Sequence, residues 1–317
     1  MRLTPLIFIA AAFPAAARDI KIGLPVDCTL NETCYIQQYR DSDPSDGVRD
    51  FACGDLAYDG HRGTDFALPS LKAMRAGVRV IASAPGTVIG VRDGVEDKAY
   101  VTGMDLGGQD CGNGVRIDHG GGWQTQYCHM RKGSVQVKRG DRVAMGAALG
   151  LVGLSGRTQF PHAHLTVWHN GIDIDPFRPE SRATCDPAST QGLWRDPIPY
   201  LPAGLIEIGF AVELPRYDDV KGGLDPSPLP VAAPQLVLWA YGWGLRAGDE
   251  MRFEMQGPNG FHLSRTGPIE KRQALGLRYF GKKLGKGGLA RGAYTGTVIL
   301  LRGGKELGRK TIRQTAH

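Results

Sequence analysis

The chain has 317 residues, with 38 lysines and arginines against 32 acids and a formal net charge of +6 at pH 7. This length exceeds what one modest hydrophobic core organises, which predicts two domains. Glycine (45) and proline (20) are abundant and separate short alternating apolar runs, while long helical periodicity is missing. The sequence therefore predicts an all-β protein, and it shows no internal repeat or low-complexity tract.

The N-terminus has the features of an export signal. Arg2 is followed by an apolar run over residues 3–17 that ends in three alanines. A charged start, an apolar stretch of this length and an Ala-x-Ala end are typical of a cleavable signal peptide. The run is too short to span a bilayer comfortably, and no later stretch is apolar enough. We expect a signal peptide over residues 1–17 and a soluble mature chain from about Arg18, periplasmic or secreted, without a transmembrane segment.

Six cysteines fit that destination, because an even number in an exported chain predicts disulfides rather than thiolate metal ligands. Cys111 precedes and Cys128 ends an apparent hairpin that turns at residues 120–122, so these two are predicted to pair. Their bridge would brace the strand that delivers His129. The remaining four allow three pairings, and one option ties the N-terminal extension to the last of them. These four are Cys28, Cys34, Cys53 and Cys185.

Histidines and one aspartate have the spacing of a metal site. His61 and Asp65 flank Gly63 in a segment that reads as a loop entering a strand, and a loop can fold both side chains onto one ion. His162 and His164 lie two apart in an extended run, so they face one side, about 6.6 Å apart along the strand. Straight strand geometry makes it awkward for both to bind one ion. One of the pair is expected to ligate while the other stands beside the open coordination position.

A further histidine, His129, lies on an intervening strand and completes the set. Three nitrogen or carboxylate ligands with an open fourth position are typical of catalytic zinc, whereas structural zinc closes all four positions. These residues therefore predict a metal-dependent hydrolase. The other four histidines have no site role: His119 is expected at a hairpin turn, and the rest are expected in solvent. These are His169, His262 and His317.

At these residues the chain resembles the lysostaphin-type zinc endopeptidases, which cut peptidoglycan cross-bridges or stem peptides. The resemblance runs from His61 to about Pro176, and its motifs arrive in the family's order. They are His-x-Gly-x-Asp at residues 61–65, Tyr-x-His at residues 127–129 and Pro-His-x-His at residues 161–164.

The resemblance implies a role for each matched residue. It makes His61, Asp65 and His164 the ligands of one Zn²⁺ per chain. It makes His129 and His162 the catalytic histidines, as acid-base or oxyanion groups. Zinc lowers the pKa of its water to about 7, and a histidine near neutrality can move the proton or hold the oxyanion. The sequence leaves open which of the two histidines is the base.

Two insertions depart from the family pattern. Residues 70–75 follow Pro69, where the family commonly turns at once into the next strand. A longer insertion covers about residues 93–112. Neither touches a matched site residue, and both are expected to wall the substrate groove.

The C-terminal third is predicted to form a separate β domain. Short strands are expected at residues 205–212, 235–241, 250–255, 292–301 and 310–313, with turns at 258–260 and 303–304. This spacing favours an immunoglobulin-like β-sandwich. The predicted division is an N-terminal extension over 18–60, a zinc peptidase domain over 61–185, a proline-rich linker over 186–202 and the sandwich over 203–317.

The end of the chain is basic. From Lys271 onward there are twelve lysines and arginines and one acid, Glu306. Such a face attracts anionic polymers at low salt. For an exported protein these are wall glycans, wall-linked polymers or lipid head groups rather than nucleic acid. A solvated face that aids solubility is the other interpretation.

Together these features predict a secreted zinc endopeptidase that hydrolyses peptide bonds in peptidoglycan stem peptides or cross-links. Two alternatives stay open. One is a non-catalytic wall-binding or amidase-activating regulator, although all five matched residues are kept. The other is a metalloprotease for glycine-rich proteins.

Overall fold

The computed structural model describes residues 20–180 and 192–317. The predicted signal peptide and Cys185 lie outside these ranges. Strands dominate the described residues and pair antiparallel, so the all-β prediction is confirmed. No described helix is both long enough and apolar enough to cross a membrane.

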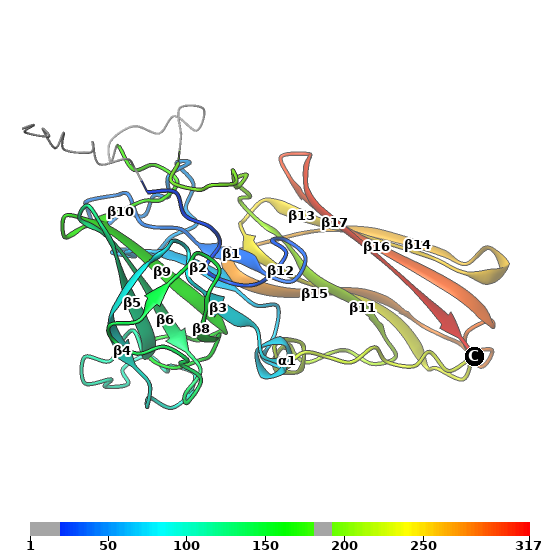
Figure 1. Cartoon of the computed structure of the whole chain (residues 1–317). Coiled ribbons are helices and arrows are strands. Elements are labelled where there is room, and N and C mark those ends of the chain that lie inside the picture. Colours follow the sequence, from blue (N-terminus) through cyan, green and yellow to red (C-terminus); the bar gives the residue numbers. More distant parts are fainter. Residues whose placement is uncertain (1–19, 181–191) are drawn as a thin grey trace, which may run out of the picture.

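One eight-stranded sheet carries the three sequence motifs (Figure 1). Its order is β1-β2-β9-β6-β5-β4-β7, with β10 paired to β9. The strands are β1 (Tyr35–Gln38), β2 (Thr64–Ala67), β4 (Gly86–Arg92), β5 (Asn113–Gly120), β6 (Trp123–Met130), β7 (Arg142–Val143), β9 (His162–His169) and β10 (Ile172–Ile174). The predicted hairpin at residues 120–122 joins β5 to β6. This order places β2, β9 and β6, which bear the motifs, next to one another.

The two faces of this sheet differ in chemistry because side chains alternate along each strand. Ala163 and Leu165 of β9 are fully buried, as are their cross-strand partners Phe66 and Tyr127. These four side chains belong to the apolar core of the N-terminal half of the molecule. The intervening histidines of β9 therefore face the opposite side, where the polar site lies.

Shorter elements surround the sheet. A two-stranded sheet pairs β3 (Arg79–Ile81) with β8 (Ala148–Leu151). The insertion at residues 70–75 forms most of a short helix, α1 (Leu71–Ala76), which the sequence did not predict. The Ser70 side chain accepts a hydrogen bond from the Ala73 amide and so caps this helix. The helix contacts α2 (Tyr217–Gly222), and its expected role as a wall of the substrate groove stays a prediction.

The C-terminal strands form two sheets that enclose a second apolar core. The sheets have the orders β11-β12-β15 and β14-β13-β16-β17. Phe210 and Leu238 of the first sheet and Phe253 and Val298 of the second belong to this core. The elements are β11 (Gly204–Ala211), β12 (Gln235–Leu245), β13 (Asp249–Gln256), η1 (Pro258–Gly260), β14 (His262–Pro268), β15 (Gln273–Lys283), β16 (Gly292–Arg302) and β17 (Lys305–Ala316). This arrangement is a sandwich, and its immunoglobulin-like connectivity stays a prediction.

Two of these strands were not expected from the sequence. The basic segment at residues 278–283 lies on β15, an eleven-residue strand at the edge of its sheet. The other unexpected strand is β14, which pairs with β13 across the turn at residues 258–260. The expected turn at residues 303–304 joins β16 to β17.

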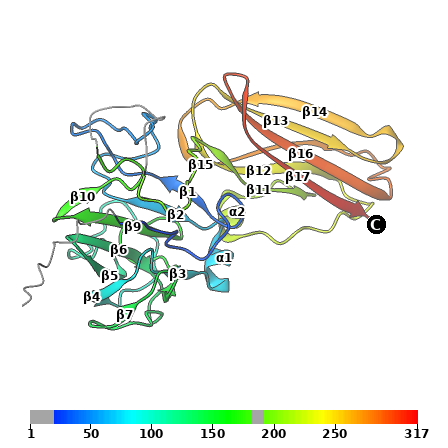
Figure 2. The ribbon, with the colours of Figure 1, turned by 45° about the horizontal axis from the view of Figure 1, so that its top comes forward.

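The two halves pack against each other along β1 and β12 (Figure 2). The rings of Tyr35 on β1 and Trp243 on β12 stack with centroids 5.5 Å apart. Gln37 Nε2 on β1 donates to the Ala274 carbonyl at 3.1 Å. One apolar cluster includes both Phe66 and Trp243. This apolar core extends from one half into the other and does not mark a boundary between domains. The predicted domain boundaries therefore stay a prediction.

All five cysteines of the described residues are disulfide-bonded. Cys111 bonds to Cys128, which confirms the predicted pair. Cys28 bonds to Cys34 within the N-terminal extension. Cys53 is also disulfide-bonded. The proposed tie to Cys185 falls on a residue outside the described ranges.

Candidate metal centre

The register of the central strands places the motif residues in one row. Asp65 on β2 lies opposite His164 on β9, and His164 lies opposite Cys128 on β6. On the other side of β2, Gln38 on β1 lies opposite Asp65. Directly opposed residues in an antiparallel sheet project to the same face. The row therefore brings one carboxylate and one imidazole together, with His162 two residues along the same strand.

The loop before β2 delivers His61. Its ring reaches the row because Gly63 lets the backbone pass close to β9. A Cβ at Gly63 would stand 2.5 Å from His164 Nε2 and 2.5 Å from the Leu165 carbonyl oxygen. No other residue fits there without moving the strand. The middle position of His-x-Gly-x-Asp is thus explained by close approach.

A local break in β6 delivers His129. Strict alternation after Cys128 would point the next side chain to the core. His129 instead has a left-handed backbone with φ 61°, and the β5–β6 register shifts at this point. A bulge of this kind redirects a side chain. The His129 amide donates to the Cys111 carbonyl at 2.8 Å, and the Gly153 amide donates to the His129 carbonyl at 3.0 Å.

One ring nitrogen of each site histidine is engaged by a protein oxygen. Nδ1 of His61 donates to the Tyr39 carbonyl at 2.6 Å, and Nδ1 of His129 donates to the Ser155 carbonyl at 2.8 Å. Nδ1 of His162 lies 3.0 Å from the Phe160 carbonyl. These contacts leave Nε2 of all three as the lone-pair nitrogen that faces the site.

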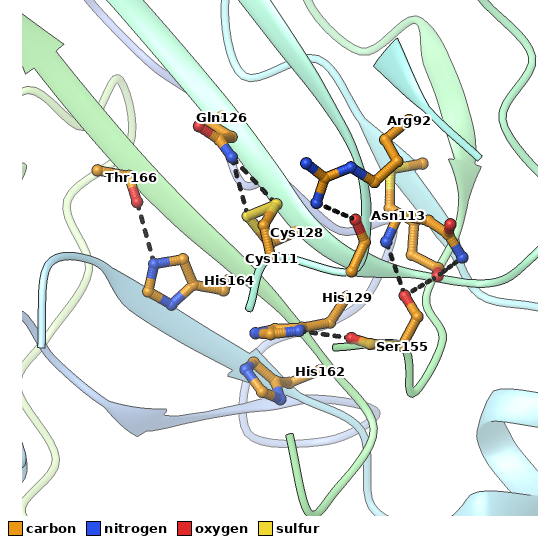
Figure 3. The surroundings of a disulfide bond; sticks show 12 residues. Arg92, Cys111, Asn113, Gln126, Cys128, His129, Ser155, His162, His164 and Thr166 are labelled. Carbon is orange, nitrogen blue, oxygen red and sulfur yellow. Dashed lines mark hydrogen bonds between the residues drawn. A yellow bond between two sulfur atoms is a disulfide. The ribbon is translucent and has the colours of Figure 1, made fainter. Parts of the chain in front are cut away.

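His164 is turned the other way. Its Nε2 lies 3.0 Å from Thr166 Oγ1 (Figure 3). Its Nδ1 therefore faces Asp65, 2.8 Å from Oδ1. This difference resolves the difficulty of two histidines spaced two apart on a strand. His162 presents Nε2, the ring nitrogen farther from its backbone, and His164 presents Nδ1, the nearer one. Both nitrogens therefore reach one centre.

The distances between the donor atoms fit a zinc ion. Asp65 Oδ1 lies 2.8 Å from His164 Nδ1 and 3.2 Å from His61 Nε2, and these two nitrogens are 3.2 Å apart. Ligands at tetrahedral corners about 2.0–2.1 Å from zinc are about 3.3 Å apart. His162 Nε2 lies 3.3 Å from the same carboxylate oxygen.

Two groups of three could hold the ion, and they share His164. One is His61, Asp65 and His164; the other is His129, His162 and His164. The first combines two imidazoles with a carboxylate, and its donor atoms are in mutual contact. The structure thus brings together all five residues that the sequence singled out. Their division into ligands and catalytic groups stays a prediction.

Burial and charge set the protonation of the centre. Burial raises the Asp65 pKa, but His61, His162 and His164 more than offset it and hold this pKa well below its usual range. Burial, followed by the neighbouring His162 and His164, lowers the His129 pKa well below its usual value. Burial also lowers the His164 pKa. Burial lowers the His61 pKa, but Asp65 more than offsets this effect, so the His61 pKa is raised above its usual value. Metal ligands must be deprotonated, so the low pKa values of Asp65 and His164 favour metal binding, whereas His61 gives up its proton more readily once a cation is bound.

The Cys111–Cys128 disulfide borders the centre (Figure 3). Gln126 Nε2 contacts both sulfur atoms, at 3.0 and 3.3 Å. Close by, Ser155 Oγ donates to the Met130 carbonyl at 2.7 Å. These contacts hold the strand on both sides of His129.

The longer insertion is tied to the loops that flank the centre. Asp97 accepts hydrogen bonds from the amides of Lys132 and Leu154, and Asp93 accepts from the amides of Gly133 and Val135. Residues 93 and 97 of the insertion thus stand beside the strand ends that carry His129 and His162. That the insertion walls a substrate groove stays a prediction.

The remaining histidines lie outside the centre. His119, at the hairpin end, has its Nε2 2.8 Å from Thr125 Oγ1. His169 is partly buried rather than fully solvated as expected, because its ring stacks on Trp123 with centroids 4.1 Å apart. His262 and His317 are exposed as expected.

Sequence reasoning missed two neighbours of the centre. Thr166, which holds His164, follows it by two residues, so strand alternation could have found it. Tyr58 stacks on His61 with centroids 4.3 Å apart. No spacing rule could have placed Tyr58 there, because it lies on an irregular loop.

The part of the chain that carries this centre is similar to known proteins. Residues 59–176 match the model of peptidase family M23. The chain is 36% identical over 118 residues to the peptidoglycan DD-endopeptidase ShyA of Vibrio cholerae, covering 37% of this chain and 22% of ShyA. It is 33% identical over 116 residues to ShyC of the same organism, covering 37% of this chain and 22% of ShyC. The chain thus spans about a fifth of the length of these curated relatives.

Solved structures give similar matches. The catalytic domain of the prophage-encoded M23 protein EnpA from Enterococcus faecalis is 23% identical, with a TM-score of 0.33, and covers 51% of this chain and 96% of that domain. The match of residues 59–176 encloses all five side chains of the centre.

Proposed function

Residues 59–176 form a peptidase family M23 domain of the lysostaphin type, and from this premise we propose that the protein is an exported zinc endopeptidase. Its substrates are peptide bonds in peptidoglycan stem peptides or cross-links. The observation that carries the proposal is the convergence of five side chains with fixed ring orientations on one face of the sheet. The peptidoglycan endopeptidases among the relatives support the substrate class.

The chain's own residues supply the remaining chemistry. His61 Nε2, Asp65 Oδ1 and His164 Nδ1 would hold the zinc, which when bound polarises the scissile carbonyl and lowers the pKa of water. His129 and His162 each present Nε2, because Nδ1 of each faces a backbone carbonyl. Either Nε2 can accept the proton of the attacking water, donate it to the leaving amine or hydrogen-bond the developing oxyanion.

Digestion of sacculi tests the proposal. Mature protein is incubated with purified peptidoglycan sacculi, with and without a chelator, and the released fragments are identified by mass spectrometry. We expect fragments from peptide-bond cleavage that disappear with chelator and with the His164→Ala variant. Release that is absent under both conditions would favour a non-catalytic regulator. Cleavage of glycine-rich proteins but not of sacculi would favour the other alternative.

We also propose that the basic C-terminal half recruits an anionic wall polymer. Some of the basic residues form ion pairs within the chain: Arg302 pairs with Asp249, and Arg309 pairs with Glu306. The cluster that stays exposed is at the end of β15 and in the loop after it. Its residues are Lys282, Lys283 and Lys286.

Charge reversal in the full chain tests this recruitment. Changing all three lysines of the cluster to glutamate should abolish sedimentation with sacculi at low salt. Hydrolysis of soluble fragments should be unchanged, because the cluster does not contact the metal centre. Equal sedimentation of both proteins would reduce the cluster to a solvated face.

A further inference from the structure

A cavity of about 330 Å³ is formed by strands β4, β5 and β6 and by the longer insertion. Its lining includes Arg92, Arg116 and Gln126 from the strands and Gly108 and Cys111 from the insertion. The volume falls within the range of small-molecule sites, about 300–1,000 Å³. Among the described residues that line it, both charged ones are arginines and none is an acid. The cavity is therefore suited to an anion.

Glycines leave the floor of this cavity without side chains. Arg116 on β5 lies opposite Gly90 on β4, and Arg92 on β4 lies opposite Gly114 on β5. The two arginines therefore project to the same face, two residues apart in register, with a glycine beside each. A Cβ at Gly114 would stand 2.4 Å from the Tyr127 carbonyl oxygen, so a larger residue does not fit there without a shift. The hollow between the arginines is thus built into the sheet.

The cavity and the metal centre lie on the same face of the sheet. Gln126 on β6 lies opposite Arg116 on β5 and opposite Thr166 on β9. Thr166 is two residues from His164 on β9, and Gln126 is two residues from Cys128 on β6, so these rows project together. Gln126 Nε2 lies 3.3 Å from Cys128 Sγ, and Cys128 lies opposite His164 (Figure 3). The row of Arg116 is therefore the next row after that of the candidate ligands.

A peptide of ordinary length can span the two sites. His164, Gln126 and Arg116 are each partly exposed, so solvent reaches this face at both rows and between them. Two strand spacings of about 4.8 Å and one row of about 7 Å place the Cα atoms of His164 and Arg116 about 12 Å apart. Extended peptide residues advance about 3.3 Å each, so three or four of them bridge about this distance.

Both arginines present unpaired guanidinium groups. The Arg116 guanidinium carbon lies 4.5 Å from the centre of the Trp168 ring, a cation–π contact that orients its plane. Its Nε is buried, and no described residue forms a hydrogen bond or ion pair with its two Nη nitrogens. Arg92 is exposed, and its Nη1 donates to the Gly112 carbonyl at 3.4 Å. The Arg116 Nη nitrogens and the remaining Arg92 donors are thus left for a ligand.

We propose that this cavity binds a free carboxylate of the peptide substrate. The two Nη nitrogens of Arg116 donate to the carboxylate oxygens, and Arg92 adds a second positive charge. A planar guanidinium matches the geometry of a carboxylate, which makes such pairs stronger than neutral hydrogen bonds. The inference rests on the proposed peptidase function, since it names a charge that the substrate carries about three or four residues from the scissile bond.

Neutralising the carboxylates of the ligand tests the site in the full zinc-loaded chain. Peptidoglycan fragments are solubilised from sacculi with a muramidase and incubated with wild-type protein until no further change occurs. Half of them are then amidated with carbodiimide and ammonia. Calorimetry gives the affinity of wild type, Arg116→Gln and Arg92→Gln for both preparations. Arg252→Gln, a half-buried strand residue on β13, is the matched control because it does not line the cavity.

The expected affinities form a cycle between protein and ligand. Arg116→Gln should weaken binding of the untreated fragments about 10- to 100-fold, because it removes charge-assisted hydrogen bonds. Arg92→Gln should weaken it about 5-fold, since this arginine is exposed. The amidated fragments should bind wild type weakly and bind both variants equally, because the partner of the arginines is gone. The control should match the wild type, and zinc content and thermal unfolding should be kept throughout.

A steric variant gives an independent measurement. A Cβ at Gly90 would meet only the Arg116 Cβ, at 3.6 Å, which is an ordinary contact. Gly90→Val therefore fills the floor without removing a charge, and it should also weaken binding of the untreated fragments. Synthetic tetrapeptides amidated at the C-terminus alone or at the side chain alone identify which carboxylate is bound.

The readouts separate this site from the peptidase. Unchanged affinity in both arginine variants, or an equal loss for untreated and amidated fragments, would overturn the carboxylate site even if hydrolysis is observed. Affinity that depends on both the arginines and the carboxylates, without hydrolysis by the wild type, would keep the site and reject the peptidase.

Discussion

The two halves of the molecule bury different kinds of side chain. In the described residues before 181, the buried set includes charged and polar groups such as His61, Asp65, His129 and His162. In the described residues from 192 onward, Asp249 is the one buried polar or charged side chain, and it pairs with Arg302. The second half is built as an apolar sandwich, while the first half carries a costly polar interior.

This difference in buried side chains indicates that the functional site lies in the first half. Burying polar groups costs free energy unless partners satisfy them, so a dense buried cluster indicates a specific role. In the first half the partners are backbone carbonyls and Thr166, which orient the rings. Changes in the first half should therefore alter zinc and turnover, and changes in the second half should alter stability and binding.

The largest effect is expected from removing a shared ligand. His164→Ala removes a donor that belongs to both candidate ligand groups, so zinc and activity should be lost together. Zinc stabilises transition-state charge by several kcal/mol, which corresponds to at least about 1,000-fold in rate. Metal analysis and fragment release from sacculi measure the two losses. If the variant kept its full zinc content and full activity, the assignment of the metal centre to the first half would be contradicted.

The next largest effect separates catalysis from metal binding. His129→Ala and His162→Ala should each slow turnover about 100- to 1,000-fold, because each removes a proton-transfer or oxyanion group. Both should still bind zinc when it is supplied in excess, since orienting contacts alone change metal affinity about 10- to 100-fold. Retention of zinc by His164→Ala and its loss from His162→Ala would reverse the assignment within His-x-His.

A core substitution in the second half should have the opposite profile. Phe253 is buried between the two sheets of the sandwich. Phe253→Ala should lower the free energy of unfolding by about 3–5 kcal/mol through lost burial and a residual cavity. Zinc content and kcat of the folded protein should match the wild type. Denaturant unfolding followed by metal analysis checks both, and a loss of zinc in the folded variant would contradict the separation of roles.

The disulfides allow a matched test within the first half. Replacing both Cys111 and Cys128 by serine opens a link of 17-residue separation next to His129. This should cost about 3 kcal/mol of stability and lower kcat. The pair Cys28 and Cys34 closes a short loop in the extension, so its serine variant should keep kcat. Equal kcat in both variants would show that the first bridge does not hold His129.

The last effect concerns pH. Burial raises the pKa of Asp175 to about 7. The folded protein then binds a proton that the unfolded chain releases above about pH 4, so stability falls as pH rises from about 4 to 7. The slope from this one group is about 1.4 kcal/mol per pH unit at most. Asp175→Asn should flatten the stability profile in that window. A profile identical to wild type would show that Asp175 does not titrate there.

The sequence identified the site better than it identified the fold around it. The spacing of several site residues predicts their relative positions. Examples are His162 and His164 on one strand and the two cysteines across the hairpin. The backbone break at His129 has no sequence signal, because a left-handed histidine depends on the Cys111 and Gly153 contacts. The orientation of the His164 ring is set by its contact with Thr166. Because Thr166 lies two residues further along the same strand, the alternation of side chains could have predicted this contact.

The missed elements share a physical cause. Helix α1 has six residues and is held by the Ser70 cap, so it is too short for a 3.6-residue period to show. Strand β15 carries Arg278, Lys282 and Lys283, whose charges mask its alternation. The packing of Trp243 on Tyr35 joins residues 208 positions apart, and no local pattern predicts it.

The most direct test of the central claim is to locate the metal. Crystals of the zinc-loaded protein, measured on both sides of the zinc absorption edge, give an anomalous difference map. The account predicts one peak per chain, about 2.0–2.2 Å from His61 Nε2, Asp65 Oδ1 and His164 Nδ1, with Nε2 of His129 and His162 beyond bonding distance. A peak bonded instead to His129, His162 and His164, or no peak at this face of the sheet, would contradict it.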